Sequence, residues 1–250
     1  YATPTPVTDG ERVYAVFGEG GAAAFSFDGR VLWTNTEHPF YSQHGLGASP
    51  ILVDSLVLQP RDGSSDGEDK TLGWQKPWDR SFLLALDART GRTVYRAKRG
   101  LSRIAHVTPA VVTVAGRKQV VSPAGDVVQG FEPASGRLLW TARSEGEGVV
   151  PSVVRAGDLV VTASGFGDPA LRAYRLGGSG DVTATHLAWE QKKAVPMISS
   201  PAVAAGLVFV VNEKGIASAL DAATGAVVWQ ERLPGTYSAS PLAADGRVLR

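Results

Sequence analysis

The chain has 250 residues, 44% of them apolar, which is enough to bury the core of a single all-β domain. Its 25 basic and 24 acidic residues leave a formal charge of +1, so it lacks the strong field that would attract nucleic acid or an acidic membrane face. With no cysteine and no apolar run near the ~20 residues of a transmembrane helix, disulfides, thiolate metal ligands and a membrane span are excluded. We therefore expect neither a nucleic-acid partner nor a transmembrane segment.

A small residue followed by proline recurs along the chain and marks the start of each of six units. The six pairs are Thr5-Pro6, Ser49-Pro50, Thr108-Pro109, Val150-Pro151, Ser200-Pro201 and Ser240-Pro241. Their spacing of about 40 to 60 residues is typical of four-stranded propeller blades, two of them enlarged by insertions. Proline is tolerated at the first residue of a strand, and small neighbours suit strands crowded around an axis. The pairs therefore predict the innermost strand of each blade.

Each pair is followed by a turn and then by an apolar run such as "LVFVV" at 207–211. Such runs predict strands that are buried on both faces, as in a sheet packed between two other sheets. The predicted fold class is all-β, a propeller of four-stranded antiparallel blades forming one domain. We expect blades at approximately 1–35, 46–96, 105–142, 149–190 and 198–231, and a partial unit of one inner strand at 238–250.

The chain has no initial methionine and stops in what reads as a strand. Because propellers remove free sheet edges by closing the ring, the unpartnered strand favours a longer protein with seven or eight blades.

The phrase "SALDAATGAVVWQ" at 218–230 predicts how neighbouring blades are held together. Its Asp can bond the amides of the turn, and its Gly can adopt positive φ. The Trp that follows can fill the gap to the next blade, and we expect Trp229→Ala to cost roughly 3 to 5 kcal/mol. The predicted blade-docking residues are Trp33, Asp87, Gly91, Tyr95, Gly136, Trp140, Trp189, Asp221, Gly225 and Trp229.

The phrases "ALDARTG" and "ALDAATGAVVW" resemble the tryptophan-docking repeats of quinoprotein alcohol dehydrogenases, the PQQ-like repeat propellers. More narrowly, "YATPTPVTDGERVYAVFG", "GDVTATHLAW" and "GTYSASPLAADGRV" resemble the bacterial PQQ-binding-like propeller proteins of the BamB type. The resemblance implies an extracytoplasmic location in the periplasm or cell envelope and a role in outer-membrane assembly. It also implies PQQ and calcium as cofactors of related enzymes. Those enzymes carry an adjacent cysteine pair that has no counterpart here, so we expect no bound cofactor.

Antiparallel strands reverse direction, so the loops between second and third strands emerge on the same side as the connectors between blades. We call this side the loop-rich face. It should collect segments 38–47, 60–81, 99–107, 165–170, 192–197 and 235–239. Loops on a rigid scaffold concentrate binding residues, although polar side chains in loops are also ordinary. The ligand-face candidates, for a protein partner or a small ligand, are Tyr41, His44, Trp78, Arg103, His106, Lys193 and Tyr237.

Two glycine-rich stretches could suggest ligand loops. "DGSSDGED" at 62–69 places oxygen-bearing side chains at Asp62, Ser64 and Asp66, the start of a calcium-loop pattern. Gly73 stands where the bidentate Glu is expected, which favours a solvated loop instead. "GEGGAAA" at 18–24 is followed by strand-like residues, so a hairpin is favoured over a dinucleotide loop.

No G-x-S-x-G elbow, H-E-x-x-H pair or phosphate loop with lysine is present. The sequence therefore favours a non-catalytic binding or assembly scaffold. A PQQ-dependent dehydrogenase, and a hydrolase or lyase site in the axial funnel, stay open as alternatives.

Overall fold

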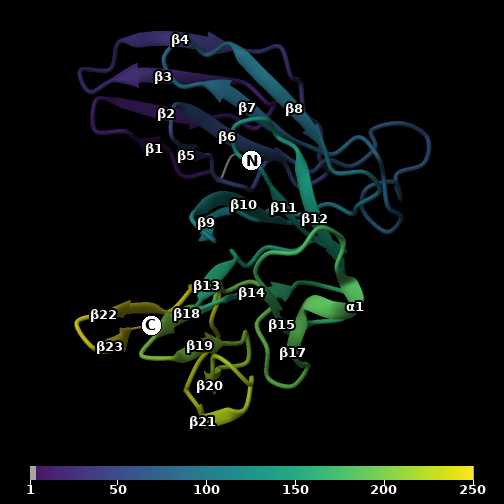
Figure 1. Cartoon of the computed structure of the whole chain (residues 1–250), viewed down its shortest axis with the longest axis vertical. Coiled ribbons are helices and arrows are strands. Elements are labelled where there is room, and N and C mark those ends of the chain that lie inside the picture. Colours follow the sequence, from purple (N-terminus) through teal and green to yellow (C-terminus); the bar gives the residue numbers. More distant parts are fainter. Residues whose placement is uncertain (1–3, 250) are drawn as a thin grey trace.

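A computed structural model describes residues 4–249, and the predicted all-β propeller is confirmed. Four-stranded antiparallel sheets follow one another around an axis, with blade one at the top of Figure 1 and blade five at the bottom. In each blade the strands pair in chain order from the axis outward. No helix in the described part of the chain is long and apolar enough to span a membrane.

The strands of the five blades are as follows. Blade one comprises β1 (Val7–Thr8), β2 (Arg12–Val16), β3 (Ala22–Ser26) and β4 (Val31–Asn35). Blade two comprises β5 (Ile51–Val53), β6 (Leu56–Arg61), β7 (Phe82–Asp87) and β8 (Thr93–Lys98). Blade three comprises β9 (Ala110–Val114), β10 (Arg117–Pro123), β11 (Val127–Phe131) and β12 (Leu138–Arg143). Blade four comprises β13 (Val154–Ala156), β14 (Leu159–Ser164), β15 (Ala170–Arg175) and β17 (Leu187–Gln191). Blade five comprises β18 (Ala202–Ala204), β19 (Leu207–Val211), β20 (Ile216–Asp221) and β21 (Val227–Arg232).

The middle strands are buried on both faces, as their apolar runs predict. Every residue of β6 and of β11 is buried, and so is every residue of β15 except the last. A strand enclosed between two neighbouring sheets cannot keep one face in water, so it cannot alternate apolar and polar residues. The core is consequently a series of layers between blades rather than one central cluster.

Hydrogen bonds between successive blades explain why the residue before each proline is usually Ser or Thr. The amide of that residue donates to the hydroxyl at the same position in the next blade, as in Thr5 to Ser49 (2.9 Å) and Ser49 to Thr108 (3.0 Å). Ser200 donates to Ser240 in the same way (2.9 Å). These bonds satisfy amides that have no ladder partner near the axis.

Aromatic side chains of the outer strands dock on the turn of the following blade. The Trp33 indole Nε1 donates to the carbonyl of Ala88 (2.9 Å), and the Trp189 Nε1 donates to that of Ala222 (3.0 Å). Each acceptor directly follows the turn's Asp, whose carboxylate accepts hydrogen bonds from the amides two and three residues after the Asp. The turn glycine leaves room for the ring, because a Cβ on Gly225 would lie 2.6 Å from the Trp189 indole.

Two departures from the Trp pattern keep blades in contact by other means. The Tyr95 hydroxyl donates to the carbonyl of Pro133 (2.7 Å), the position equivalent to Ala88, and its ring lies against Gly136. Blade four lacks the Asp-to-Gly turn, and its replacement segment instead pairs Gly180 with the backbone of Trp140. The Trp140 indole is 1% exposed, donates to the Gln119 amide oxygen (3.0 Å) and packs with residues of blades three and four.

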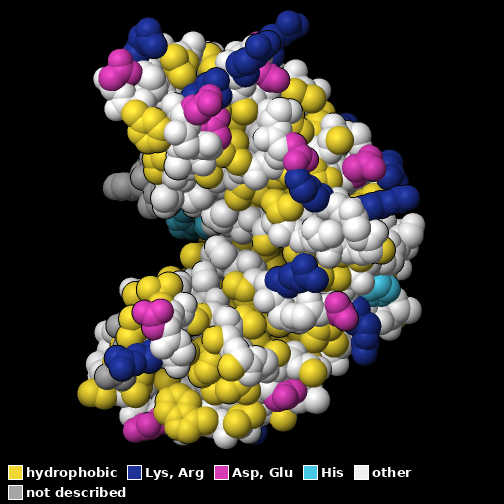
Figure 2. Space-filling view, turned by 60° about the vertical axis from the view of Figure 1, so that its left-hand side comes forward, with side chains coloured by type: hydrophobic (Ala, Val, Ile, Leu, Met, Phe, Trp, Pro, Cys, Tyr) yellow, Lys and Arg dark blue, Asp and Glu magenta, His cyan; other side chains and the backbone are white. Residues whose placement is uncertain are grey.

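The predicted docking of Trp229 on a following blade is not tested within residues 4–249. The Trp229 indole is 45% exposed, and every residue of β21 is exposed. The next sheet within residues 4–249 has only β22 (Leu242–Ala244) and β23 (Arg247–Leu249), so no third-to-fourth-strand turn reaches the indole. Hydrophobic side chains accordingly gather on the surface at the lower end of the molecule in Figure 2, where blade five lies.

Two further details differ from the sequence prediction. The partial unit is a two-stranded hairpin rather than a single strand. Blade three gains a fifth, parallel strand, β16 (Gly180–Asp181), which pairs with β12 and is followed by the short helix α1 (Thr183–His186). Strand β16 and helix α1 both lie in the segment that replaces the usual turn of blade four.

Candidate functional site

A pocket of about 640 Å³ lies on the loop-rich face, between the connectors that enter blades two, three and four. The side chains around it come from those connectors, from the insertion between β6 and β7 and from the loop between β14 and β15. They belong to His44, Trp74, His106, Glu147, Gly148, Val150 and Phe166. A second pocket, of about 590 Å³, lies beside β21 and β23. No titratable side chain lines it. A third pocket, of about 510 Å³, lies beside β12 and β16, and its lining includes Arg99, Arg143 and Asp181. The first pocket is the candidate site because it joins three connectors of the loop-rich face.

The wall formed by Glu147 and Phe166 is fixed by the backbone. The two residues exchange both of their hydrogen bonds, at 3.1 and 3.0 Å, so their side chains project to the same side. Gly148 has φ +57°, and a Cβ there would lie 3.2 Å from Trp74 and 3.5 Å from Phe166. The glycine therefore lets both rings close over the connector.

Two histidines form the opposite side. The His44 ring lies edge-on to the Trp74 indole, with centroids 5.0 Å apart, and 6.1 Å from the His106 ring. The backbone amide of His106 donates to the Val149 carbonyl (2.7 Å), which joins two of the connectors. Burial, followed by the nearby His44, lowers the pKa of His106 to about 4. His106 is therefore neutral near pH 7, and its buried Nε2 has no hydrogen-bond partner.

A buried guanidinium braces the loops behind the pocket. Arg172 is 5% exposed and donates to the Glu190 carboxylate (2.5 Å), the Ser164 hydroxyl (3.0 Å) and the Glu145 carbonyl (3.2 Å). Because Ser164 ends β14 and Glu145 lies in the connector, one side chain ties both walls together.

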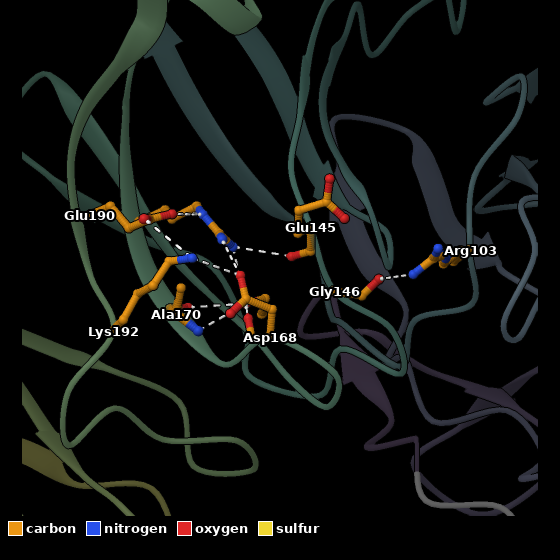
Figure 3. Close-up of polar contacts among 9 residues, drawn as sticks. Arg103, Glu145, Gly146, Asp168, Ala170, Glu190 and Lys192 are labelled. Atoms are coloured by element: carbon orange, nitrogen blue, oxygen red, sulfur yellow. Dashed lines mark hydrogen bonds and ion pairs between the residues drawn. The ribbon is translucent and has the colours of Figure 1, made fainter.

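Further polar contacts extend this support. Lys192 and Glu190 converge with Asp168 on one side of Figure 3, and Lys192 donates to the Asp168 carboxylate at 2.9 Å. On the other side Arg103 donates to the Gly146 carbonyl (3.2 Å). The connector that carries Glu147 is therefore held from both sides.

Of the seven predicted ligand-face residues, the structure brings only His44 and His106 together in the pocket. Arg103 braces the connector instead, and Trp78 pairs through its backbone with Ser102 while Arg80 covers its ring. The hydroxyl of Tyr237 donates to the Pro234 carbonyl (2.8 Å). Tyr41 and Lys193 are exposed and do not line the pocket.

Sequence reasoning missed Trp74, Glu147 and Phe166 as pocket residues. Trp74 is the first of the two indoles in the 60–81 insertion, and Phe166 lies in the 165–170 loop, which the sequence analysis placed on the loop-rich face. The signal for Glu147 is its place between two glycines in "EGEG" at 145–148, in a connector that the sequence-based prediction did not include.

The candidate metal residues Asp62, Ser64 and Asp66 are not grouped as a metal site, and the favoured solvated loop is wrong for residues 62–65, which are buried. Asp62 is 2% exposed, and Arg99 occupies both of its carboxylate oxygens, at 2.5 and 3.1 Å. The Ser64 hydroxyl accepts a hydrogen bond from the backbone amide of Gln43 (3.1 Å), whereas Asp66 is on the surface. Within residues 4–249 no three His, Cys, Asp or Glu residues are grouped as a metal site would require. Asp62, the first residue of the calcium-loop pattern, therefore forms a buried ion pair with Arg99.

The pocket does not fit the cofactors implied by the resemblance. Calcium takes six to eight oxygen ligands, whereas the carboxylate of Glu147 is the only acidic group lining this pocket. PQQ is an anionic quinone, and no Lys or Arg side chain is among the described residues that line the pocket. Its carboxylates would meet Glu147 and a neutral imidazole.

Comparisons with known proteins support the same fold. The family model described as outer membrane protein assembly factor BamB matches residues 79–196 and 175–250. Among curated proteins no significant match is found.

Three solved structures show how far the likeness extends. BamB from Moraxella catarrhalis is 17% identical, with a TM-score of 0.64, and the match covers 97% of this chain and 64% of that one. The computationally designed Ika8 protein is 12% identical (TM-score 0.66), with 97% of this chain and 65% of that one covered. A europium-containing methanol dehydrogenase is 12% identical (TM-score 0.51), with 98% and 72% covered. At these identities the likeness shows the fold, and this chain spans 64% of the length of the Moraxella protein.

Proposed function

This chain belongs to the family of the outer membrane protein assembly factor BamB, and we propose that it is a non-catalytic scaffold that binds a protein partner through its loop-rich face. The observation that carries the proposal is the aromatic-walled pocket on that face, whose walls are braced by Arg172. A preorganised apolar site with a few polar groups is the usual form of a recognition site, because little ordering cost is paid on binding. In line with the family, we propose that the protein works outside the cytoplasm.

Photo-crosslinking from matched positions tests this function. The photoreactive amino acid p-benzoylphenylalanine would replace Phe166, which is 40% exposed at the pocket, in the full-length protein expressed in its host. The control is the same replacement of Phe27, which is 68% exposed in the turn between β3 and β4, on the opposite face. We expect a discrete crosslinked partner from position 166 and none from position 27. Crosslinking from position 27 alone would refute binding through the loop-rich face.

A PQQ-dependent dehydrogenase is the second candidate, favoured by the fold shared with the methanol dehydrogenase. The purified full-length protein, incubated with PQQ and calcium, would be assayed for the quinone absorbance band and for dye-linked alcohol oxidation. We expect neither a shifted band nor turnover. Robust turnover that depends on the quinone would overturn the scaffold assignment.

A further inference from the structure

The carboxylate of Glu147 stands in the pocket without a counter-ion in the described part of the chain. Nearby cations are engaged elsewhere, since Arg172 pairs with Glu190 and Lys192 with Asp168. The Nη1 of Arg103 is used by the Gly146 carbonyl. The Glu147 carboxylate is therefore available to pair with a cationic ligand.

The other lining groups narrow the chemistry of that ligand. Trp74 and Phe166 both lie against Gly148, so two aromatic side chains stand beside the carboxylate. Aromatic faces attract cations through their quadrupole, most strongly when water is excluded. The His106 imidazole lines the same space, although its Nε2 is fully buried. A matching ligand is thus a flat cation with several hydrogen-bond donors.

We propose that this pocket binds the guanidinium group of an arginine side chain presented by the partner, and the inference rests on the partner-binding function proposed above. A guanidinium is planar, weakly hydrated, stacks on aromatic rings and carries five donors in a fixed fork. Two donors can engage Glu147 in parallel, which is the strong geometry for a carboxylate, while the guanidinium plane stacks on an aromatic ring. The volume of about 640 Å³ leaves room for the flanking peptide as well.

Other ligand classes leave part of the site unmatched. An anion would face Glu147 with no opposing cation on the lining. A neutral aromatic compound would cover the rings but remove water from the Glu147 carboxylate without replacing the hydrogen bonds of that water, which is costly. An arginine side chain matches the carboxylate and the aromatic walls together.

A matched pair of peptides tests the charge requirement. Calorimetric titration of the protein would use acetyl-Gly-Arg-Gly-amide and the same peptide with citrulline, which has the same shape as arginine but no charge. We expect the citrulline peptide to bind about tenfold more weakly, because it lacks the charged bidentate pair. Equal affinity for the two peptides, or no binding of the arginine peptide, would overturn the proposal.

A matched pair of variants tests the residue. Glu147→Gln should weaken the arginine peptide about tenfold while leaving the citrulline peptide unchanged. Glu145→Gln is the control, because this exposed side chain lies outside the pocket and only its backbone carbonyl is used by Arg172. An equal effect of the two substitutions would contradict a specific role for Glu147. If crosslinking from Phe166 succeeds while the peptide experiments fail, the scaffold function stands and the arginine site falls.

Discussion

In the 250-residue chain as given, two tryptophans at equivalent positions of the repeat should differ in their contribution to stability. Trp189 is 8% exposed and Trp229 is 45% exposed, although each is the third residue of its outer strand. On an indole of ~200 to 250 Å² this difference is ~80 Å² of surface, or ~2 kcal/mol at ~25 cal/mol per Å². Trp189→Ala also removes the donor to the Ala222 carbonyl, worth ~1 kcal/mol. We expect Trp189→Ala to cost ~3 to 5 kcal/mol and Trp229→Ala ~2 to 3 kcal/mol less.

Urea unfolding followed by circular dichroism measures this difference, since both variants lose the same side chain and can be compared at equal denaturant dependence. Trp33→Ala serves as a second buried case, with 8% exposure and the same type of indole hydrogen bond. Equal losses for Trp189→Ala and Trp229→Ala would refute the reasoning that docking on the next turn, rather than the local phrase, provides the stability.

Three further substitutions examine the turn, the buried ion pair and the pocket. Gly225→Ala should destabilise the protein by ~2 kcal/mol or more in thermal melts, because φ is +72° and the new Cβ meets the Trp189 ring. Gly206→Ala is the control. Its φ of +77° is similar, but open space surrounds the new Cβ, so the cost should be only ~1 kcal/mol. Asp62→Asn should cost ~3 to 5 kcal/mol in urea unfolding, since it leaves Arg99 charged and buried without its counter-ion; a loss below ~1 kcal/mol would contradict this. The pKa of His106 is about 4 in the folded protein and ~6.5 in the unfolded chain. As the pH falls, the imidazole of the unfolded chain is therefore protonated before that of the folded protein. The stability from neutral His106, at most ~3 kcal/mol, is therefore complete above pH ~6.5 and lost as the pH falls towards 4. The stability of His106→Gln should depend less on pH over this range, and an unchanged dependence would count against the assignment.

The sequence predicted the blades because their signals are local. The Ser-Pro and Thr-Pro pairs, the two-sided apolar runs and the Asp-to-Gly turns each act within one unit, and each recurs along the chain. The burial of an outer-strand aromatic is different, because it depends on the neighbouring blade. Tyr95 and Trp229 follow similar Asp-to-Gly turns, yet within residues 4–249 only Tyr95 meets a glycine turn beyond its own sheet. No property of the turn itself predicts this difference.

The pocket could be predicted only in part, because it depends on which connectors lie side by side. His44 and His106 were recognisable as loop-face histidines, but their contact depends on the way Gly47 accommodates the His106 ring. Glu147 enters the site through its backbone pairing with Phe166, a contact between segments that form no regular strand. Such isolated bridges have no repeat and therefore no periodic signal in the sequence.

The ring and the pocket are therefore determined by different parts of the chain. Docking uses a backbone carbonyl and a glycine, so any aromatic side chain with a donor suffices, and the Tyr95 hydroxyl replaces an indole without loss of the contact. The pocket uses side chains on connectors that the docking phrase does not constrain. A relative can consequently keep every docking contact and still bind a different ligand. Sequence similarity in the turn phrase therefore predicts the ring of blades, whereas the choice of ligand depends on connector residues such as Glu147 and Trp74.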